Sequence, residues 1–342
     1  MTSVLVIGGT RFIGLHAVRR LVELGCDVTV FHRGETEPEG LPPVRHLHGD
    51  REEILQRRSD FVRISPDVVL DMMPLTRAQA VDTMMTFSSI ADRLVGISSQ
   101  DVYLAYDILR KREQHSPVPT PMDEDAPLRT KRYPYRDTAD EDSPLFNYDK
   151  IPVENTYLAD PDLSGSILRL PAVYGQGDYQ HRPFPYLKRM VDGRRAILMD
   201  EAAAGWRWSR CFVENVADAI ALVATDDRAR GRVYNVAEAE THSESEWIMA
   251  IADQVGWKGE VITLPADRLP DHLRDDLDFS QSLEVDTGRI RAELGYAERV
   301  PFIEAIRRTV EWELANMPGQ LPPHRFDYVA EDEALPDLTF GI

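Results

Sequence analysis

Cysteine is scarce in this sequence, which has only Cys26 and Cys211 among its 342 residues. Two cysteines without metal-ligand spacing exclude a disulfide framework and a thiolate zinc motif, so we expect buried or half-buried thiols in a reducing compartment. Long apolar runs are also missing, and the sequence offers no membrane span. A strand pattern begins at Ser3, which leaves no room for a signal peptide. We therefore expect a cytoplasmic protein that does not act at a membrane.

Basic residues are outnumbered by acidic ones, 39 against 58, which gives a net charge of −19. Nucleic acid and anionic lipid both select basic surfaces, so this balance argues against either as a partner. The nine histidines show no ligand spacing, and we expect no metal site. Apolar residues at 43% are ordinary for a globular protein, and the length allows one large domain or two smaller ones.

The most informative segment is a glycine turn near the start, Gly8-Gly9-Thr10-Arg11-Phe12-Ile13-Gly14. It follows the apolar run Val4-Leu5-Val6-Ile7 and precedes residues 16–24, whose apolar positions recur at helical spacing. Glycine permits the tight turn, Gly14 lets the helix pack closely on the strand, and the helix N-terminus offers free N–H groups to a pyrophosphate. The segment predicts dinucleotide binding, with a purely structural turn as the alternative.

Strand and helix patterns alternate through the first half of the chain. Continuous apolar strands in such alternation predict a doubly wound parallel sheet of about seven strands, an α/β Rossmann fold with helices on both faces. We expect strands at 3–7, 27–31, 44–48, 67–71, 93–98, 165–170, 195–199, 232–236 and 260–264, and helices at 12–24, 51–58, 76–90, 147–159, 183–191, 214–225, 243–255 and 301–315.

The same patterns suggest how the chain is divided. We expect a dinucleotide-binding domain at 1–170, to which 206–238 returns, a smaller C-terminal substrate domain mainly at 171–318, and an acidic tail at 319–342. Residues 104–145 interrupt the alternation with Pro, Asp, Arg and Glu, and a loop of that length is a functional lid or a disordered insertion. Pro-rich and acidic stretches from residue 317 onward predict a tail draped on the surface or disordered.

Short motifs spread along the chain resemble one known family. They are the glycine turn, Gly49-Asp50-Arg51, Ile97-Ser98-Ser99-Gln100-Asp101-Val102-Tyr103, Lys150-Ile151-Pro152-Val153-Glu154, Leu168-Arg169-Leu170-Pro171-Ala172-Val173-Tyr174-Gly175, Phe212-Val213-Glu214-Asn215-Val216-Ala217 and Tyr234-Asn235-Val236. Their order is similar to that in the extended short-chain dehydrogenase/reductases, the nucleotide-sugar epimerases and dehydratases, over about residues 3–315. The resemblance implies a dinucleotide cofactor, a sugar-like small-molecule substrate and a homodimer through two helices of the N-terminal domain.

The catalytic motif departs from the family pattern, in which Tyr-x-x-x-Lys places both side chains on one helix face. Lys150 fits, and the resemblance assigns it to catalysis and to the cofactor ribose, but Phe146 stands where the tyrosine should be. Tyr148 is about 200° from Lys150 around a regular helix, so it can act only if the helix begins late. Pro152 favours a start near Ile151, because proline belongs in a first helical turn. We predict Tyr148 as the acid/base, as in atypical relatives whose tyrosine has moved.

Further candidate site residues stand at positions that match functional positions of the family. Ser99 matches the family's catalytic serine or threonine, or it caps local backbone; Asp101 matches a dehydratase carboxylate, or it is an ordinary turn residue. Pro171 matches the backbone beside the nicotinamide carboxamide. The predicted substrate-binding residues are Tyr103, Arg207 and Arg210, with core packing as the alternative for Tyr103. The resemblance implies that Arg207 and Arg210 stand where relatives hold the diphosphate of a nucleotide sugar.

The cofactor preference is predicted from the end of the second strand. NAD-specific relatives place a carboxylate there for the ribose 2′-hydroxyl, whereas this chain has His32 and Arg33. Arg33 and Arg11 together suit a 2′-phosphate, which favours NADP, with NAD as second choice. Asp50 resembles the acid that contacts adenine, or it is a helix N-cap.

The leading functional hypothesis is an NAD(P)-dependent epimerase, dehydratase or reductase that acts on a sugar-like or nucleotide-sugar carbonyl or hydroxyl. Phe146 motivates the alternative, an NADP-binding sensor or scaffold without redox turnover. A third hypothesis, RNA binding, conflicts with the net charge of −19.

Overall fold

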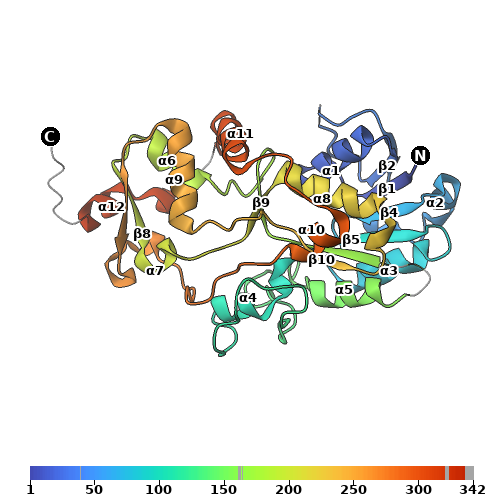
Figure 1. The fold of residues 1–342 in the computed structure, drawn as a ribbon, viewed down its shortest axis with the longest axis horizontal. Helices are drawn as coiled ribbons and strands as arrows, with labels where there is room; N and C mark the ends of the chain where they lie inside the picture. The colour runs from blue at the N-terminus through green and yellow to red at the C-terminus, as the bar shows by residue number, and fades with distance from the viewer. Residues whose placement is uncertain (39, 161–162, 164, 320–322, 336–342) are drawn as a thin grey trace.

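A parallel sheet of seven strands lies toward one end of the molecule, on the right in Figure 1. The computed structural model describes residues 1–38, 40–160, 163, 165–319 and 323–335. The strand order is β10-β6-β5-β4-β1-β2-β3, and every neighbouring pair is parallel. The strands are β1 Ser3–Ile7, β2 Asp27–His32, β3 Arg45–His48, β4 Val68–Asp71, β5 Arg93–Ser99, β6 Gly165–Leu170 and β10 Val233–Asn235. The predicted doubly wound Rossmann sheet is confirmed.

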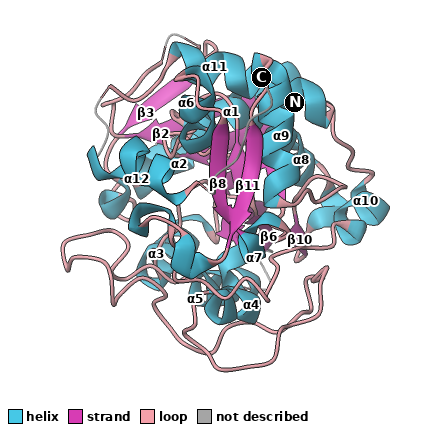
Figure 2. Ribbon diagram, turned by 90° about the vertical axis from the view of Figure 1, so that its left-hand side faces the viewer, coloured by secondary structure: helices cyan, strands magenta, loops and turns pink. Residues whose placement is uncertain are grey.

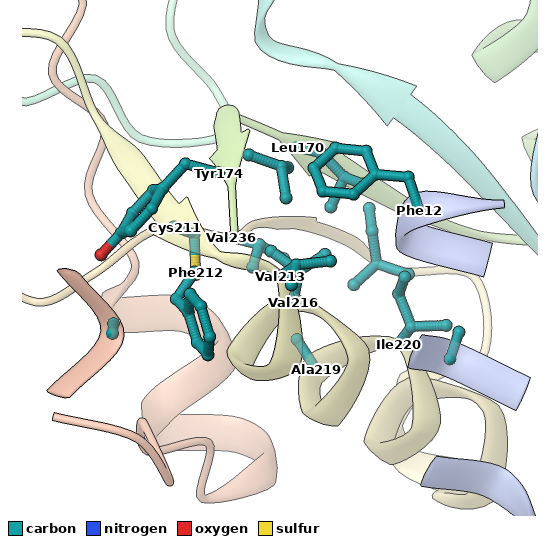
Figure 3. Close-up of a cluster of buried hydrophobic side chains, with 14 of the residues drawn as sticks. Phe12, Leu170, Tyr174, Cys211, Phe212, Val213, Val216, Ala219, Ile220 and Val236 are labelled. Atoms are coloured by element: carbon teal, nitrogen blue, oxygen red, sulfur yellow. The ribbon is translucent and has the colours of Figure 1, made fainter. Parts of the chain in front are cut away.

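Helices cover both faces of this sheet, because its strands are apolar on both sides. Val4 and Val6 point to the layer of α1 (Phe12–Glu23) and α8 (Val213–Thr225), whereas Leu5 and Ile7 point to the opposite layer. That opposite layer consists of α2 (Arg58–Ile64), α3 (Arg77–Phe87) and α5 (Lys150–Leu158). Figure 3 shows the first layer, where Val213, Val216 and Ile220 of α8 pack near Phe12 and Leu170.

A second group of elements lies at the other end of the molecule (Figures 1 and 2). Its parallel pair is β8 (Ala196–Asp200) with β11 (Glu260–Leu264), and a second pair, β7 (Ala172–Tyr174) with β9 (Arg210–Phe212), leaves the main sheet after β6. The remaining helices are α4 Leu104–Leu109, α6 Phe184–Val191, α7 Glu201–Ala204, α9 Glu244–Val255, α10 Gly288–Leu294, α11 Phe302–Ala315 and α12 Tyr328–Ala334.

One sequence expectation needs correction. The helix expected at 51–58 is wrong: a single 3₁₀ turn spans Arg51–Glu53, and α2 begins only at Arg58. Ile54 and Phe61 both pack into the core, each from its own turn. Of the two alternatives for the tail, residues 323–335 agree with a segment draped on the surface, because α12 is docked through buried Glu331, which pairs with Arg189 of α6 at 2.5 Å. Residues 320–322 and 336–342 lie outside the described part.

Two further features are the state of the cysteines and the apolar length of the helices. Cys26 is half-buried, Cys211 is fully buried, and both are unpaired thiols. Within the described residues, no helix combines the length and the apolar character that crossing a membrane requires.

Candidate functional site

The glycine turn joins β1 to α1 with the backbone geometry that a dinucleotide requires. Gly8 and Gly9 have φ of 91° and 100°, a region that favours glycine. A Cβ on Gly14 would lie 2.5 Å from Cα of Gly9, so only glycine allows this close approach of helix and turn. The Arg11 side chain does not cap α1, which leaves the first N–H groups of the helix free of a side-chain partner. The residues present therefore fit a bound pyrophosphate.

The arginines predicted to bind the 2′-phosphate both border the connection between β2 and β3. Arg11 donates from Nε and Nη2 to Thr36 Oγ1, at 3.1 and 2.8 Å. Arg33 pairs with Glu35 at 2.9 Å, and both side chains are 59% exposed. Asp50 accepts a hydrogen bond from Glu52 N–H at 2.9 Å, the geometry of the N-cap alternative.

The start of α5 decides which aromatic residue lies near Lys150. The helix begins at Lys150, with Asp149 as N-cap, so Tyr148 lies outside the regular helix. The Tyr148 side chain is buried, and Lys150 Nζ lies 5.6 Å from its ring centroid. Phe146 instead packs beneath Arg136, whose guanidinium carbon is 5.0 Å from the phenyl centroid. The helix expected from residue 147 therefore begins three residues late, which removes the objection to Tyr148 from regular helical phase.

Asp101 is the centre of a group of buried phenols. It lies in a 3₁₀ turn after β5, and its Oδ2 accepts hydrogen bonds from Tyr148 at 2.8 Å and from Tyr135 at 3.0 Å. Tyr106 extends the chain, with its hydroxyl 3.3 Å from that of Tyr135. Asp101 Oδ1 is buried and has no hydrogen-bond partner in the described residues. We call these four side chains, Asp101, Tyr106, Tyr135 and Tyr148, the Asp101 cluster.

Burial changes the proton affinity of the Asp101 cluster. It raises the pKa of Asp101, and the positive charge of Arg129 and the two phenol hydrogen bonds oppose this rise only in part. It also raises the pKa of Tyr148 well above its usual value, together with the neighbouring Asp101 carboxylate. Both groups therefore hold their protons more tightly than in water.

Lys150 is fixed by the backbone of two strand ends. Its Nζ donates to the carbonyl oxygens of Pro74 and Ile97, each at 2.9 Å. Burial lowers the pKa of Lys150 to about 8, although the Asp101 and Asp71 carboxylates favour its charged form. An ammonium has a third proton, which remains for a ligand.

The segment 104–145 contributes residues that sequence reasoning missed. Besides Tyr106 and Tyr135, it carries Arg129, which donates to the backbone oxygen of Asp101 at 2.7 Å and to Asp149 at 2.8 Å. Arg129 thus ties Asp101 to the N-cap of α5. A signal was available in Arg132-Tyr133-Pro134-Tyr135-Arg136, where aromatic and basic residues stand inside an apparently irregular loop.

The other predicted residues are placed differently. Ser99 Oγ accepts from Asp101 N–H at 3.2 Å and so caps the turn that carries Asp101. Tyr103 is fully buried and donates to Asn235 at 2.7 Å, as the packing alternative expects. Arg207 contacts Glu246 and Arg210 contacts Glu244, while Pro171 lies between β6 and β7.

A cavity of about 410 Å³ lies mainly in the second group of elements and borders α4. Of the Asp101 cluster, Tyr106 belongs to its lining, whereas Asp101, Tyr135 and Tyr148 do not; Tyr103, Arg207 and Arg210 also lie outside it. The lining combines aromatic residues with both carboxylates and cations: Trp206, Trp208, Phe279, Asp200, Glu244, Asp275, Arg110, Arg189, His272 and Arg325.

Comparison with known proteins finds relatives that share one family. The chain is 27% identical over 284 residues to the 2'-dehydrokanamycin reductase of Streptomyces kanamyceticus, which covers 80% of this chain and 72% of the relative. It is 31% identical over 140 residues to the dTDP-glucose 4,6-dehydratase of Streptomyces niveus, 41% of this chain and 38% of that relative. Its relatives are extended short-chain dehydrogenase/reductases. No family model matches the chain.

The fold is similar to that of solved epimerases over nearly the whole molecule. The UDP-glucose 4-epimerase of Thermus thermophilus, solved in complex with NAD, matches with a TM-score of 0.65 at 22% identity, over 91% of this chain and 98% of that chain. The family resemblance inferred from the motifs is therefore confirmed.

Proposed function

We propose that the protein is an NADP-dependent enzyme that interconverts a carbonyl and a hydroxyl group on a sugar-like substrate. The observation that carries this proposal is the buried hydrogen bond from Tyr148 to Asp101, next to Lys150 and at the carboxyl end of the sheet that carries the glycine turn. Ligands of open α/β sheets bind at this edge. The alignment with 2'-dehydrokanamycin reductase supports the same reaction class.

The chain's residues divide the chemistry between them. NADPH, when bound, supplies hydride to the substrate carbonyl carbon. Tyr148 donates the proton to the carbonyl oxygen, and Asp101, whose raised pKa favours its protonated form, returns a proton to Tyr148. Arg129 holds the Asp101 backbone, and Lys150 orients the cofactor ribose, as it does in the family. Ser99 fixes the turn, so we assign it a positioning role.

The preference for NADP over NAD rests on the connection between β2 and β3. Arg33 and Arg11 are the cations near the end of β2, and a 2′-phosphate offers each a charge-assisted hydrogen bond. Glu35 competes with such a phosphate for Arg33. The Arg33–Glu35 pair is exposed, so its stabilising free energy is small and a phosphate displaces Glu35 readily.

The cavity lining carries carboxylates and cations together, which suits the several hydroxyl groups of a sugar and does not by itself select an ammonium group over a phosphate. Arg207 and Arg210, the expected diphosphate ligands, are paired with carboxylates and lie outside the cavity lining. Among the residues described, Asp275 forms no ion pair, and burial together with Glu244 and Asp200 raises its pKa. The lining aromatic rings suit the apolar faces of sugar rings.

The deciding experiment is a turnover assay with reduced and oxidised cofactor. Oxidised aminoglycosides, UDP-glucose and dTDP-glucose are offered with NADPH, NADH and their oxidised forms, and nicotinamide absorbance reports turnover. Turnover of an amino-sugar ketone with NADPH is expected. Binding of NADPH without turnover of any substrate would favour the alternative of a sensor or scaffold.

Two further expectations belong to this proposal. A homodimer through helices of the N-terminal half follows from the family and is checked by sedimentation. A cytoplasmic location is supported by the two unpaired thiols and is checked by fractionation.

A further inference from the structure

Three histidines and a glutamate meet at the edge of the main sheet, although they are dispersed in the sequence. His32 ends β2, and the parallel register places it opposite His48 of β3. His46 lies two residues before His48, and residues two apart on a strand share a face. Glu37 comes from the connection between the two strands. The expectation that the histidines are scattered is therefore wrong for these three, because strand pairing brings them together.

The ligand atoms of this group, which we call the His32 cluster, lie at short distances from one another. His32 Nε2 is 2.8 Å from His46 Nδ1, and His48 Nε2 is 2.8 Å from Glu37 Oε1. Glu37 Oε1 is 3.7 Å from both His32 Nε2 and His46 Nδ1. All four atoms lie within 4.8 Å of one another.

These distances are those of a tetrahedral metal centre with small adjustments. Zinc binds nitrogen and carboxylate oxygen at about 2.0–2.2 Å, so neighbouring ligand atoms of a tetrahedron are about 3.3–3.6 Å apart. Four of the six separations, at 2.8 and 3.7 Å, bracket this value, and the other two, from His48 to His32 and to His46, are no longer than 4.8 Å, so the exposed His48 side chain must move inward. We propose that His32, Glu37, His46 and His48 form a binding site for one divalent transition-metal ion, with Zn²⁺ as the best fit.

The side chains can accept the ion without unfolding of the sheet. His32 is buried, whereas the Glu37, His46 and His48 side chains are 46%, 26% and 56% exposed, so the ion has a path from solvent. In the hydrogen-bond network Gly34 N–H donates to His32 Nδ1 at 3.2 Å, which leaves the proton on Nε2 facing His46. Metal binding at Nε2 requires the other neutral tautomer, in which the proton is on Nδ1, and so releases the contact with Gly34.

The position of the cluster links it to the cofactor side of the molecule. Glu37 follows Thr36, which accepts both hydrogen bonds from Arg11 of the glycine turn. Arg33 lies in the same connection. A metal held by Glu37 would therefore hold the connection that carries Thr36 and Arg33 against β3.

The test uses the full chain after removal of metal by chelator. Zn²⁺ is titrated calorimetrically, and Co²⁺ is added as a spectroscopic probe whose visible absorption reports tetrahedral coordination. We expect one ion per chain, tetrahedral Co²⁺ absorption, and an affinity loss of about 100-fold or more in the variant His46→Ala/His48→Ala. His115→Ala, at an exposed histidine away from the cluster, is the matched control and should bind as the unmodified chain does.

Each result of these metal titrations either supports or overturns the proposed site. Absence of Zn²⁺ binding at micromolar concentrations, or equal binding by the double variant, would overturn the site. If the double variant fails to fold, His48→Asn at the most exposed ligand and Glu37→Gln in the connection carry the test, each with circular dichroism as the fold control. The readouts need no substrate, so this result is independent of the proposed enzyme activity.

Discussion

Asp71 and Asp101 are both buried carboxylates at the carboxyl ends of neighbouring strands, yet the protein treats them in opposite ways. Asp71 ends β4 and receives two hydrogen bonds from Arg51, each 2.6 Å, and one from Tyr157 at 2.5 Å. Burial alone would raise its pKa, but the Arg51 charge and these hydrogen bonds outweigh burial, and the pKa of Asp71 is lowered. Asp101 has two phenol partners on Oδ2 and, among the described residues, no hydrogen-bond partner on Oδ1, and its pKa is raised.

We propose that the difference separates a structural carboxylate, Asp71, from one that serves proton transfer, Asp101. A carboxylate whose oxygens are satisfied by a guanidinium holds its neighbours in place and has no proton to exchange. A buried carboxylate without a direct cation binds a proton more tightly, and such groups concentrate at active sites. Each of the two aspartates accepts a hydrogen bond from a tyrosine in or next to α5: Asp71 from Tyr157, and Asp101 from Tyr148. Matched Tyr→Phe substitutions therefore test whether the two aspartates have different roles.

The largest expected effect is on turnover. Tyr148→Phe removes the proton donor and should lower kcat by about 10²–10⁴. Tyr157→Phe makes the same chemical change beside Asp71 and should leave kcat within a few-fold. Single-turnover kinetics with the substrate found in the assay measure both. Adding Phe146→Tyr to Tyr148→Phe should not restore kcat, because residue 146 lies beneath Arg136. Equal kcat losses in Tyr148→Phe and Tyr157→Phe would contradict the different roles of Asp101 and Asp71.

Asp71→Asn should have the largest effect on folding. It leaves the guanidinium of Arg51 without its carboxylate in a largely buried site, which destabilises by about 3–5 kcal/mol. Because the pKa of Asp71 is lowered in the fold, its stabilisation is present above its ordinary pKa and is lost as pH falls through the folded value. Urea unfolding at neutral and acidic pH should therefore show a gap between unmodified chain and variant that closes on acidification. A gap of under about 1 kcal/mol at neutral pH would show that the pair is not structural.

Lys150 should give cofactor binding a pH dependence. Its pKa of about 8 means that its ammonium is charged below this pH and neutral above it. Cofactor affinity should fall by about tenfold as pH rises through 8, since a charge-assisted hydrogen bond to the ribose is lost. Fluorescence titration across this pH range measures this, with Lys150→Met as a pH-independent, weakly binding control. A flat profile in the unmodified chain would exclude this role.

Arg33 should give the smallest effect and a selective one. Arg33→Ala should weaken NADP about tenfold and NAD hardly at all, because only NADP offers the 2′-phosphate. Glu35→Gln frees Arg33 and should strengthen NADP slightly. Isothermal titration measures the affinities of each variant for NADP and for NAD relative to the unmodified chain. Equal losses of NADP and NAD affinity in Arg33→Ala would contradict the proposed preference.

The sequence allowed prediction of what depends on local pattern. The main-sheet strands and most of the helices follow from period and turn residues. Motif positions predicted Asp101, Tyr148 and Lys150 as site residues; the structure places them close together, and their roles stay predictions. Tyr106, Tyr135 and Arg129 were not found, because the segment that carries them has no period and its contacts with Asp101 are long-range. The His32 cluster depends on the register between two strands, which single-residue patterns do not reveal.

The central claim is that Asp101 is a destabilised carboxylate kept for proton transfer, and equilibrium unfolding of Asp101→Asn tests it without any substrate. A group whose pKa is raised in the fold contributes stability below its ordinary pKa and loses it as pH rises through the folded value. At neutral pH, Asp101→Asn should therefore be as stable as the unmodified chain or more stable, with the advantage shrinking toward acidic pH. A loss of stability at neutral pH like that of Asp71→Asn would contradict the claim and make Asp101 a second structural carboxylate.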